Sequence, residues 1–241
     1  MGWFKGWFST RWYKMLYTHR GEEDAAELVL PLIAKGELRR GQSVLDMACG
    51  RGRHAAILAR KGMQVTGIDL SAASIQEAAR VVPAAHFEVF DIRVPYASDR
   101  FDAVVCLFTS LGYTKDRQDD QRAVTAAAEA LKSNGLFVLD LLNGDLVSRH
   151  LVPLETKVID GVRFRIERKL EGGDIVKRIQ VEHPGGKEQF EERVHAWSLP
   201  EVTAMITKAG LVVEDVTDGT CRNAFDPERS NRIITWARKK Q

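Results

Sequence analysis

The stretch Val-Leu-Asp-Met-Ala-Cys-Gly-Arg-Gly at residues 44–52 decides how this chain folds. Its apolar start predicts a short buried strand, and its glycines predict a tight turn into a helix over residues 54–61. Residues 50–55 match the loose dinucleotide pattern GxGxxA, which is a weak signal on its own. Asp46 lies inside the strand end, four residues before Gly50, where it would repel a pyrophosphate. The stretch therefore predicts a site for a cofactor with an amino group and no phosphate.

Strands and helices alternate along most of the chain. The predicted strands cover residues 43–47, 64–69, 86–91, 101–108, 136–142, 211–216 and 232–238, and the predicted helices cover residues 22–35, 54–61, 71–82, 116–132 and 199–208. This alternation predicts an α/β fold with a doubly wound, mostly parallel sheet. Right-handed crossovers bring the carboxyl ends of the parallel strands to one edge, which is where ligands bind in such folds.

Two more acids follow the second and third predicted strands. A carboxylate at Asp69 can accept both ribose hydroxyls of an adenosine. Asp91 can accept the adenine amino group, with Ile92 against the ring. Each acid taken singly could instead be a helix cap or a solvated turn residue. Together with Asp46 they line one edge of the sheet and favour an adenosyl cofactor without phosphate.

Several segments resemble one enzyme family. Residues 44–54 resemble motif I of the class I S-adenosylmethionine-dependent methyltransferases, residues 65–71 their second motif, and residues 101–105 and 136–140 their fourth- and fifth-strand motifs. Residues 12–17 and 108–113 are similar to a small-molecule methyltransferase subgroup that carries a strand-rich insertion after the fifth strand. One departure is Ser-Asn-Gly at residues 133–135, where the family usually has Pro-Gly-Gly.

The resemblance implies a Rossmann-like, seven-stranded methyltransferase sheet and a defined activity. The enzyme would transfer a methyl group from S-adenosylmethionine to an O, N or C nucleophile of a small-molecule acceptor, with S-adenosylhomocysteine as the product. The implied cofactor contacts in the sheet domain are Asp46, Ala48, Gly50, Gly52, Asp69, Leu70, Asp91, Ile92, Leu107 and Phe108. Among these, Gly50 and Gly52 would form the loop under the methionine moiety, and Leu107 and Phe108 would flank the sulfonium.

Aromatic residues crowd residues 1–21, namely Trp3, Phe4, Trp7, Phe8, Trp12, Tyr13 and Tyr17. This segment could be a helix that packs its aromatic face on the domain. The charges are too few and too mixed to favour a membrane-surface helix. As a lid, the segment would present Tyr13 and Tyr17 to the cationic sulfonium. Arg20 could pair with the cofactor carboxylate.

Residues 151–198 differ in pattern from the rest of the chain. Apolar and charged residues alternate between glycine turns, which predicts an antiparallel sheet with one wet face. The basic side chains assigned to that face are Arg163, Arg165, Arg168, Lys169, Lys177 and Arg178. We expect this insertion to roof the acceptor pocket or to form a homodimer interface. Residues 22–150 and 199–241 then make up the cofactor-binding core.

Methyl transfer depends mainly on the position of the nucleophile, because the leaving group is neutral and good. A hydroxyl or amine nucleophile must also lose a proton. Tyr113, Asn143 and His195 are the candidates for contact with the acceptor. The other candidate bases are His19, His54 and His150, although His54 is better suited to a structural role or to the methionine end of the cofactor.

Composition limits the partners and the location. The net charge of +2 and the absence of an RNA-binding module favour neither nucleic acid nor membrane as a partner. No apolar run approaches the roughly 20 residues that span a bilayer, and no secretory signal is recognised. The three separated cysteines indicate buried thiols in the cytoplasm rather than disulfides or a metal site.

Three alternatives stay open at this point. The chain could methylate tRNA or rRNA, which would make its affinity for RNA strongly dependent on salt. It could bind the cofactor without turnover and regulate a partner. It could also be a nicotinamide dehydrogenase, which would bind NAD instead of S-adenosylmethionine.

Overall fold

The computed structural model describes residues 4–18 and 21–240. Seven strands form the central sheet in the order β10-β11-β5-β4-β1-β2-β3. Their bounds are β1 Ser43–Met47, β2 Gln64–Asp69, β3 His86–Val89, β4 Phe101–Cys106, β5 Leu131–Leu142, β10 Leu211–Thr217 and β11 Arg232–Lys239. Strands β1 to β5 pair in parallel, and β11 runs antiparallel to both of its neighbours. The predicted doubly wound α/β fold is confirmed.

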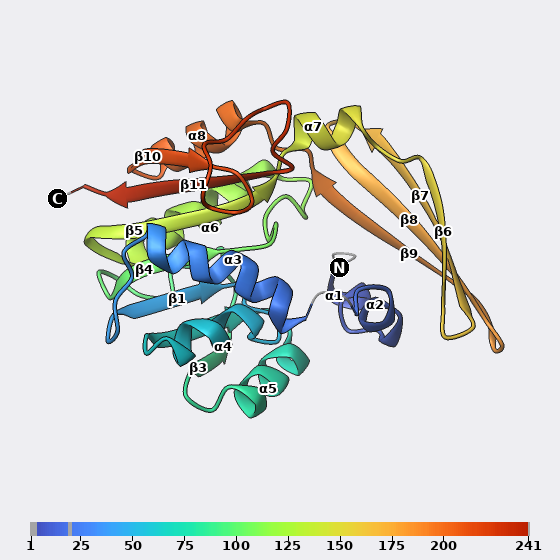
Figure 1. Ribbon diagram of the computed structural model, residues 1–241, viewed down its shortest axis with the longest axis horizontal. Helices are drawn as coiled ribbons and strands as arrows, with labels where there is room; N and C mark the ends of the chain where they lie inside the picture. The colour runs from blue at the N-terminus through green and yellow to red at the C-terminus, as the bar shows by residue number, and fades with distance from the viewer. Residues whose placement is uncertain (1–3, 19–20, 241) are drawn as a thin grey trace.

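Helices cover both faces of this sheet (Figure 1). Helices α3 (Glu22–Lys35) and α4 (Arg53–Arg60) pack on one face, and α6 (Arg117–Ala130) and α8 (Leu199–Lys208) pack on the other. Helix α5 (Ala72–Val81) contacts β2 and β3. Because the inner strands are covered on both sides, β4 and residues 136–142 of β5 are mostly apolar.

The insertion forms a separate four-stranded antiparallel sheet in the order β6-β7-β8-β9. Its strands are β6 Leu154–Ile159, β7 Val162–Glu171, β8 Asp174–His183 and β9 Gly186–His195, and the short helix α7 (Gly144–Arg149) leads into it. Along β7 buried and exposed residues alternate, as predicted for a sheet with one wet face. The assignment of two basic residues to the wet face is wrong. Arg168 and Lys177 pair across β7 and β8 in register with the buried face, and their side chains are only 20% and 14% exposed.

The N-terminal segment forms two short helices instead of one, α1 (Phe4–Trp7) and α2 (Arg11–Leu16). Thr10 caps the start of α2, because its hydroxyl accepts a hydrogen bond from the backbone N–H of Tyr13 at 3.0 Å. The aromatic side chains described in this segment, Trp7, Phe8, Trp12, Tyr13 and Tyr17, pack on the insertion sheet and not on the central sheet. Figure 1 shows α1 and α2 between the core and the buried face of β6–β9.

Most predicted element boundaries lie within two residues of the observed ones. Three differences have physical reasons. Strand β4 ends at Cys106 and not at residue 108, because Phe108 and Thr109 adopt left-handed backbone with φ of 62° and 58°. Strand β5 begins five residues earlier than predicted, at Leu131, because Leu131 already pairs with Phe101 and residues 132–135 then bulge out of register with β4. Helix α7 was not predicted, because its six residues show too little periodicity to indicate a helix.

Candidate active site

The glycine loop between β1 and α4 lies at the carboxyl edge of the central sheet. Ala48, Gly50 and Gly52 all have positive φ, of 56°, 55° and 77°. A Cβ atom at Gly50 would meet nothing within 4 Å, so the loop is open at that point. At Gly52 a Cβ atom would lie 3.0 Å from the Phe87 ring and 3.1 Å from Cβ of Ala78. Gly52 is therefore required for the packing of the loop, and Gly50 leaves room for a ligand.

Asp46 at the end of β1 is a buried carboxylate with a spare acceptor. Its side chain is 1% exposed, and Oδ2 has no hydrogen-bond partner within the described protein. Burial raises its pKa to about 7, and the nearby charge of Asp69 adds to that rise. A buried carboxyl oxygen without a partner is unfavourable unless a ligand supplies a donor. An ammonium group would both satisfy this oxygen and compensate the charge.

Asp69 at the end of β2 already has a structural role. Its Oδ2 accepts the backbone N–H of Gly50 at 3.0 Å, and its Oδ1 accepts that of Ser71 at 2.8 Å. Burial nevertheless raises its pKa. Each carboxylate oxygen has a second lone pair, so both can still accept a hydroxyl. The side chain of Leu70, the next residue, is exposed on the same edge.

His54 lies on α4 just after the glycine loop and is 5% exposed. Burial lowers its pKa to about 3, and the positive charges of Arg53 and Arg232 add to that effect. Its Nε2 has no partner among the described residues. A histidine that is held neutral in this way cannot form an ion pair with a carboxylate. Its ring nitrogens can still donate or accept a hydrogen bond.

The predicted sulfonium neighbours lie at the end of β4, which is the strand beside β1. Leu107 is buried, and the ring of Phe108 lies against α4. The guanidinium carbons of Arg53 and Arg232 lie 4.2 Å and 5.1 Å from the centre of the Phe108 ring. The ring thus lies between the helix that follows the glycine loop and the end of the sheet.

Asp91 lies two residues beyond the end of β3, farther along than the predicted strand end. Its carboxylate forms a bidentate pair with Arg93, with distances of 2.9 Å from Nε and 2.6 Å from Nη2. Ile92 is partly buried and packs against the core on the α6 side. The structure therefore places Asp91 and Ile92 beside the carboxyl edge of the central sheet. Asp91, the acid predicted to meet the adenine amino group, is already paired with Arg93.

The N-terminal segment is fixed to the insertion by hydrogen bonds from its aromatic side chains. Trp7 Nε1 donates to Glu192 at 2.6 Å, and Trp12 Nε1 donates to Glu188 at 2.7 Å. The hydroxyl of Tyr17 also donates to Glu192, at 2.8 Å. The prediction of an aromatic face packed on the core domain is wrong, because the glutamates that receive these donors lie on β9.

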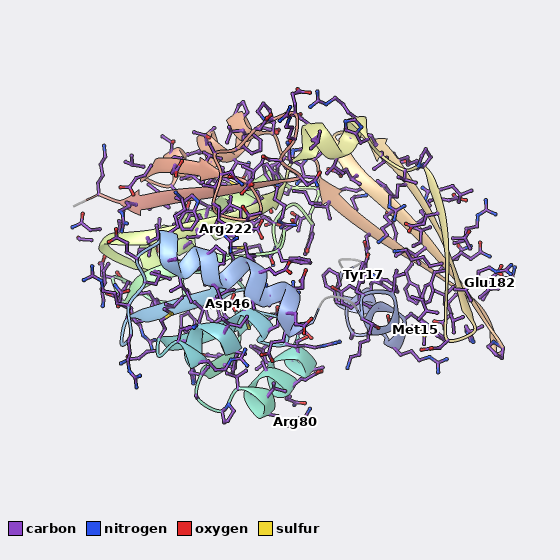
Figure 2. All side chains as sticks on the ribbon, in the orientation of Figure 1. Met15, Tyr17, Asp46, Arg80, Glu182 and Arg222 are labelled. Atoms are coloured by element: carbon purple, nitrogen blue, oxygen red, sulfur yellow. The ribbon has the colours of Figure 1, made fainter. Side chains whose placement is uncertain are left out.

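The same segment still reaches the core at two points. Lys14 pairs with Glu77 of α5 at 3.4 Å, and the Phe8 ring lies 5.7 Å from the ring of Tyr113 after β4. Tyr13 packs against Tyr17 with 4.8 Å between ring centres. Figure 2 shows Tyr17 in the space between the core that carries Asp46 and the insertion that carries Glu182. Arg20 and His19, two further predicted contacts, lie outside the described residues.

Of the three acceptor candidates, the structure gives Asn143 a different role. Its side chain is 1% exposed, and its amide donates to the carbonyls of Ser230 at 2.8 Å and Pro227 at 3.2 Å. Its Oδ1 accepts the backbone N–H of Leu146 and so caps α7. Both amide hydrogens are used, so Asn143 has a structural role around α7, and its contact with the acceptor stays a prediction.

His195 connects the insertion to the core. Its ring nitrogens lie 3.3 Å from carboxylate oxygens of Asp174 and Glu201, and its backbone N–H donates to the Gly112 carbonyl at 2.9 Å. Its side chain is 14% exposed. These contacts favour a role for His195 in joining the insertion to the core over a role as a catalytic base. Tyr113 is the candidate that faces the N-terminal segment.

The sequence did not point to Asp140 or Arg232. Asp140 is fully buried near the end of β5, and Arg232 Nε donates to it at 2.6 Å from β11. An acid inside the apolar run of residues 136–142 is a signal that could have revealed this pair. The acids Glu188 and Glu192 gave no comparable signal, because β9 is rich in charged residues along its whole length.

Comparisons with known proteins agree with this geometry. Residues 44–135 match the family model described as "Methyltransferase domain". The chain is 32% identical over 214 residues to the dTDP-4-amino-2,3,4,6-tetradeoxy-D-glucose N,N-dimethyltransferase of Saccharopolyspora spinosa, covering 84% of each protein. The chain belongs to the class I S-adenosylmethionine-dependent methyltransferases.

Two further similarities extend over most of the methyltransferase. It is 27% identical to the dTDP-3-amino-3,4,6-trideoxy-alpha-D-glucopyranose N,N-dimethyltransferase of Streptomyces venezuelae, over 86% of this chain and 91% of that protein. A solved S-adenosylmethionine-dependent methyltransferase from Clostridium acetobutylicum has the same fold, with a TM-score of 0.80 and 19% identity, covering 95% of this chain and 96% of that one.

The methyltransferase uses S-adenosylmethionine as its methyl donor, and the described residues fit that cofactor. The unpartnered oxygen of Asp46 suits its ammonium group, and the open space at Gly50 suits a ligand over the loop. When bound, the cofactor supplies an electrophilic methyl group on a sulfonium. No helix in the described part of the chain is long and apolar enough to cross a membrane.

Proposed function

We propose that this methyltransferase methylates the amino group of a sugar carried on a nucleoside diphosphate. The observation that carries the proposal is the 32% identity to a dTDP-amino-sugar N,N-dimethyltransferase over 84% of both chains. A second relative, matched over 86% of this chain, also acts on a dTDP-amino sugar. Neither relative's name points to RNA or to a regulatory role without catalysis.

An amine acceptor fits the demands of the reaction. The nitrogen attacks as the free base, so the site must favour the neutral amine and take up a proton when the bond has formed. We propose Tyr113 as a contact of the acceptor, because its loop follows β4 and its ring lies against Phe8 of the N-terminal segment. Most of the rate enhancement would then come from holding the nitrogen in line with the methyl group.

We propose the following contacts for the cofactor. Asp46 receives the ammonium group, Gly50 leaves room for the methionine chain, and Asp69 receives the ribose hydroxyls. Asp91 and Ile92 lie at the adenine end, and Leu107 and Phe108 lie near the sulfonium. The burial and unpartnered oxygen of Asp46, and Asp69 beside it at the end of β2, support this assignment.

We propose that residues 151–198 and the N-terminal segment together roof the acceptor site, over a core of residues 22–150 and 199–241. The support is the contact between the buried face of β6–β9 and the aromatic residues of α1 and α2. A homodimer stays a prediction, and light scattering of the purified enzyme tests it. The buried free cysteines Cys49, Cys106 and Cys221 support a proposed location in the cytoplasm.

Mass spectrometry of the reaction products tests the proposed acceptor. The enzyme is incubated with S-adenosylmethionine and dTDP-sugars that carry an amino group at carbon three or carbon four. dTDP-glucose, which has hydroxyls at both carbons, is the matched control, and a tRNA mixture tests the nucleic-acid alternative. We expect methylated amino sugar and a matching amount of S-adenosylhomocysteine, with neither from the controls. Methyl transfer to tRNA, or none to any amino sugar, would overturn the proposal.

A further inference from the structure

The turn after β4 has an unusual backbone. Phe108 and Thr109 are consecutive residues with φ of 62° and 58°, in the left-handed region that favours glycine. Bulky and β-branched residues are rare there because Cβ approaches the backbone too closely. Such strain persists only where the surrounding structure enforces it, and it is concentrated at functional sites.

A buried aspartate and a partly buried arginine enforce this turn. Asp140 Oδ2 accepts the backbone N–H of Phe108 at 2.8 Å, and the backbone carbonyl of Asp140 accepts the N–H of Thr109 at 2.9 Å. Arg232 Nε donates to the other carboxylate oxygen of Asp140 at 2.6 Å. Its Nη2 donates to the hydroxyl of Thr109 at 3.1 Å. One ion pair thus holds both residues of the turn.

The turn forms the side of the site that faces the glycine loop. The Phe108 ring lies 4.2 Å from the guanidinium carbon of Arg53 and 6.4 Å from the ring centre of His54. Both of these residues belong to α4, which begins directly after the glycine loop. A change in the backbone at residue 108 would therefore move the ring relative to that loop.

We propose that Asp140 and Arg232 are positioning residues for S-adenosylmethionine. They hold Phe108 and Thr109 in the left-handed turn, and the turn sets the Phe108 ring against the methionine end of the cofactor. An ordinary core ion pair would need no contact with strained residues, whereas this pair makes three hydrogen bonds to Phe108 and Thr109. The proposal concerns the cofactor and does not depend on the identity of the acceptor.

The Arg232→Gln variant tests the proposal without any need for an acceptor. Isothermal calorimetry measures its affinity for S-adenosylhomocysteine, and thermal unfolding measures its stability. We expect the affinity to fall at least tenfold at a temperature where the variant is fully folded. The matched control is Arg238→Gln on the same strand, where the arginine pairs with Glu214 at 2.9 Å away from the site. We expect the control to keep its affinity within twofold.

The same Arg232→Gln change made in a second variant of the enzyme separates an effect on the position of the turn from a general loss of stability. The Thr109→Asn variant keeps a polar side chain beside Arg232, and asparagine tolerates the left-handed conformation better than threonine. If the ion pair acts by enforcing that conformation, Arg232→Gln should lose less affinity in the Thr109→Asn background, within about threefold. A general loss of stability would give the same loss of affinity in both backgrounds.

Two results would overturn the proposal. One is an Arg232→Gln enzyme that binds S-adenosylhomocysteine within twofold of the unaltered enzyme. The other is an equal loss in the two backgrounds. If Arg232→Gln does not fold, Arg232→Lys replaces it, because lysine keeps the charge next to Asp140 but lacks the planar fork that also reaches Thr109. We then expect the same pattern with a loss of at least threefold.

Discussion

Replacement of Asp46 by asparagine should make the enzyme more stable and its cofactor binding weaker. Burial raises the pKa of Asp46 from 3.8 to about 7. Since the folded-state pKa lies above the unfolded one, the contribution of this group to stability is most favourable below about pH 4 and is lost as the pH rises from about 4 to about 7. The difference, 7 − 3.8, is about 3 units, and at about 1.4 kcal/mol per unit the ionised carboxylate destabilises the free enzyme by about 4 kcal/mol.

The buried amide of asparagine would also lack partners, which costs about 1–3 kcal/mol. We therefore expect Asp46→Asn to be about 1–3 kcal/mol more stable than the unaltered enzyme at pH 8, and to lose this advantage by pH 4. Urea unfolding of both proteins across this pH range measures the difference. Equal stability at pH 8, or an advantage that does not depend on pH, would refute the reasoning.

The same carboxylate should couple cofactor binding to a proton. An ammonium ligand favours the ionised form of Asp46, so binding near pH 7 should release protons from the unaltered enzyme. Calorimetry of S-adenosylhomocysteine binding in buffers of different ionisation enthalpy measures this release. Asp46→Asn should abolish the part due to this carboxyl group and weaken binding by at least tenfold. A proton release that is unchanged in the variant would show that the ligand's amino group lies elsewhere.

Three further predictions concern neighbouring parts of the site. Gly52→Ala and Gly50→Ala both place a side chain on left-handed backbone, which should cost about 1–2 kcal/mol of stability in thermal unfolding. Gly52→Ala should cost about 1–3 kcal/mol more, because its Cβ meets Phe87 at 3.0 Å, whereas Gly50→Ala should weaken S-adenosylhomocysteine binding, because its Cβ meets no protein atom within 4 Å and enters the space proposed for the ligand. The reverse order would contradict the assignment of the loop. Asp69→Asn should weaken the same binding by at least tenfold in calorimetry, and unchanged affinity would show that no ribose contact exists. Glu192→Gln should increase hydrogen exchange in residues 4–18, because the hydrogen bonds that Trp7 and Tyr17 donate to Glu192 lose their charged acceptor, and protection equal to the unaltered enzyme would contradict that role.

The sequence predicted the central sheet well because its signals are local. The glycine turn, the apolar strands and the capping Ser71 each involve residues close in the chain, and Ser71 does cap α5. Alternating strands and helices then allow few topologies. The same rule brings Asp46 and Asp69 to one edge, because the ends of parallel strands share an edge, whereas Asp91 lies two residues beyond the end of β3.

The N-terminal segment could not be predicted in the same way. Its aromatic residues indicate burial but not the surface on which they are buried. Trp7 and Trp12 find their acceptors on Glu192 and Glu188, more than 170 positions away in the chain. The structural role of Asn143 could not be predicted for a similar reason, since its partners Ser230 and Pro227 come from the far end of the sequence. Long-range hydrogen bonds of this kind leave no pattern in either segment alone.

The most direct test of the proposed cofactor site is a crystal structure of the enzyme with S-adenosylhomocysteine. We expect the amino group of the ligand next to Asp46 Oδ2, its ribose hydroxyls on Asp69, and its sulfur beside the Phe108 ring. A ligand bound away from the ends of β1 and β2, or an Asp69 carboxylate that contacts only the N–H groups of Gly50 and Ser71, would contradict the assignment.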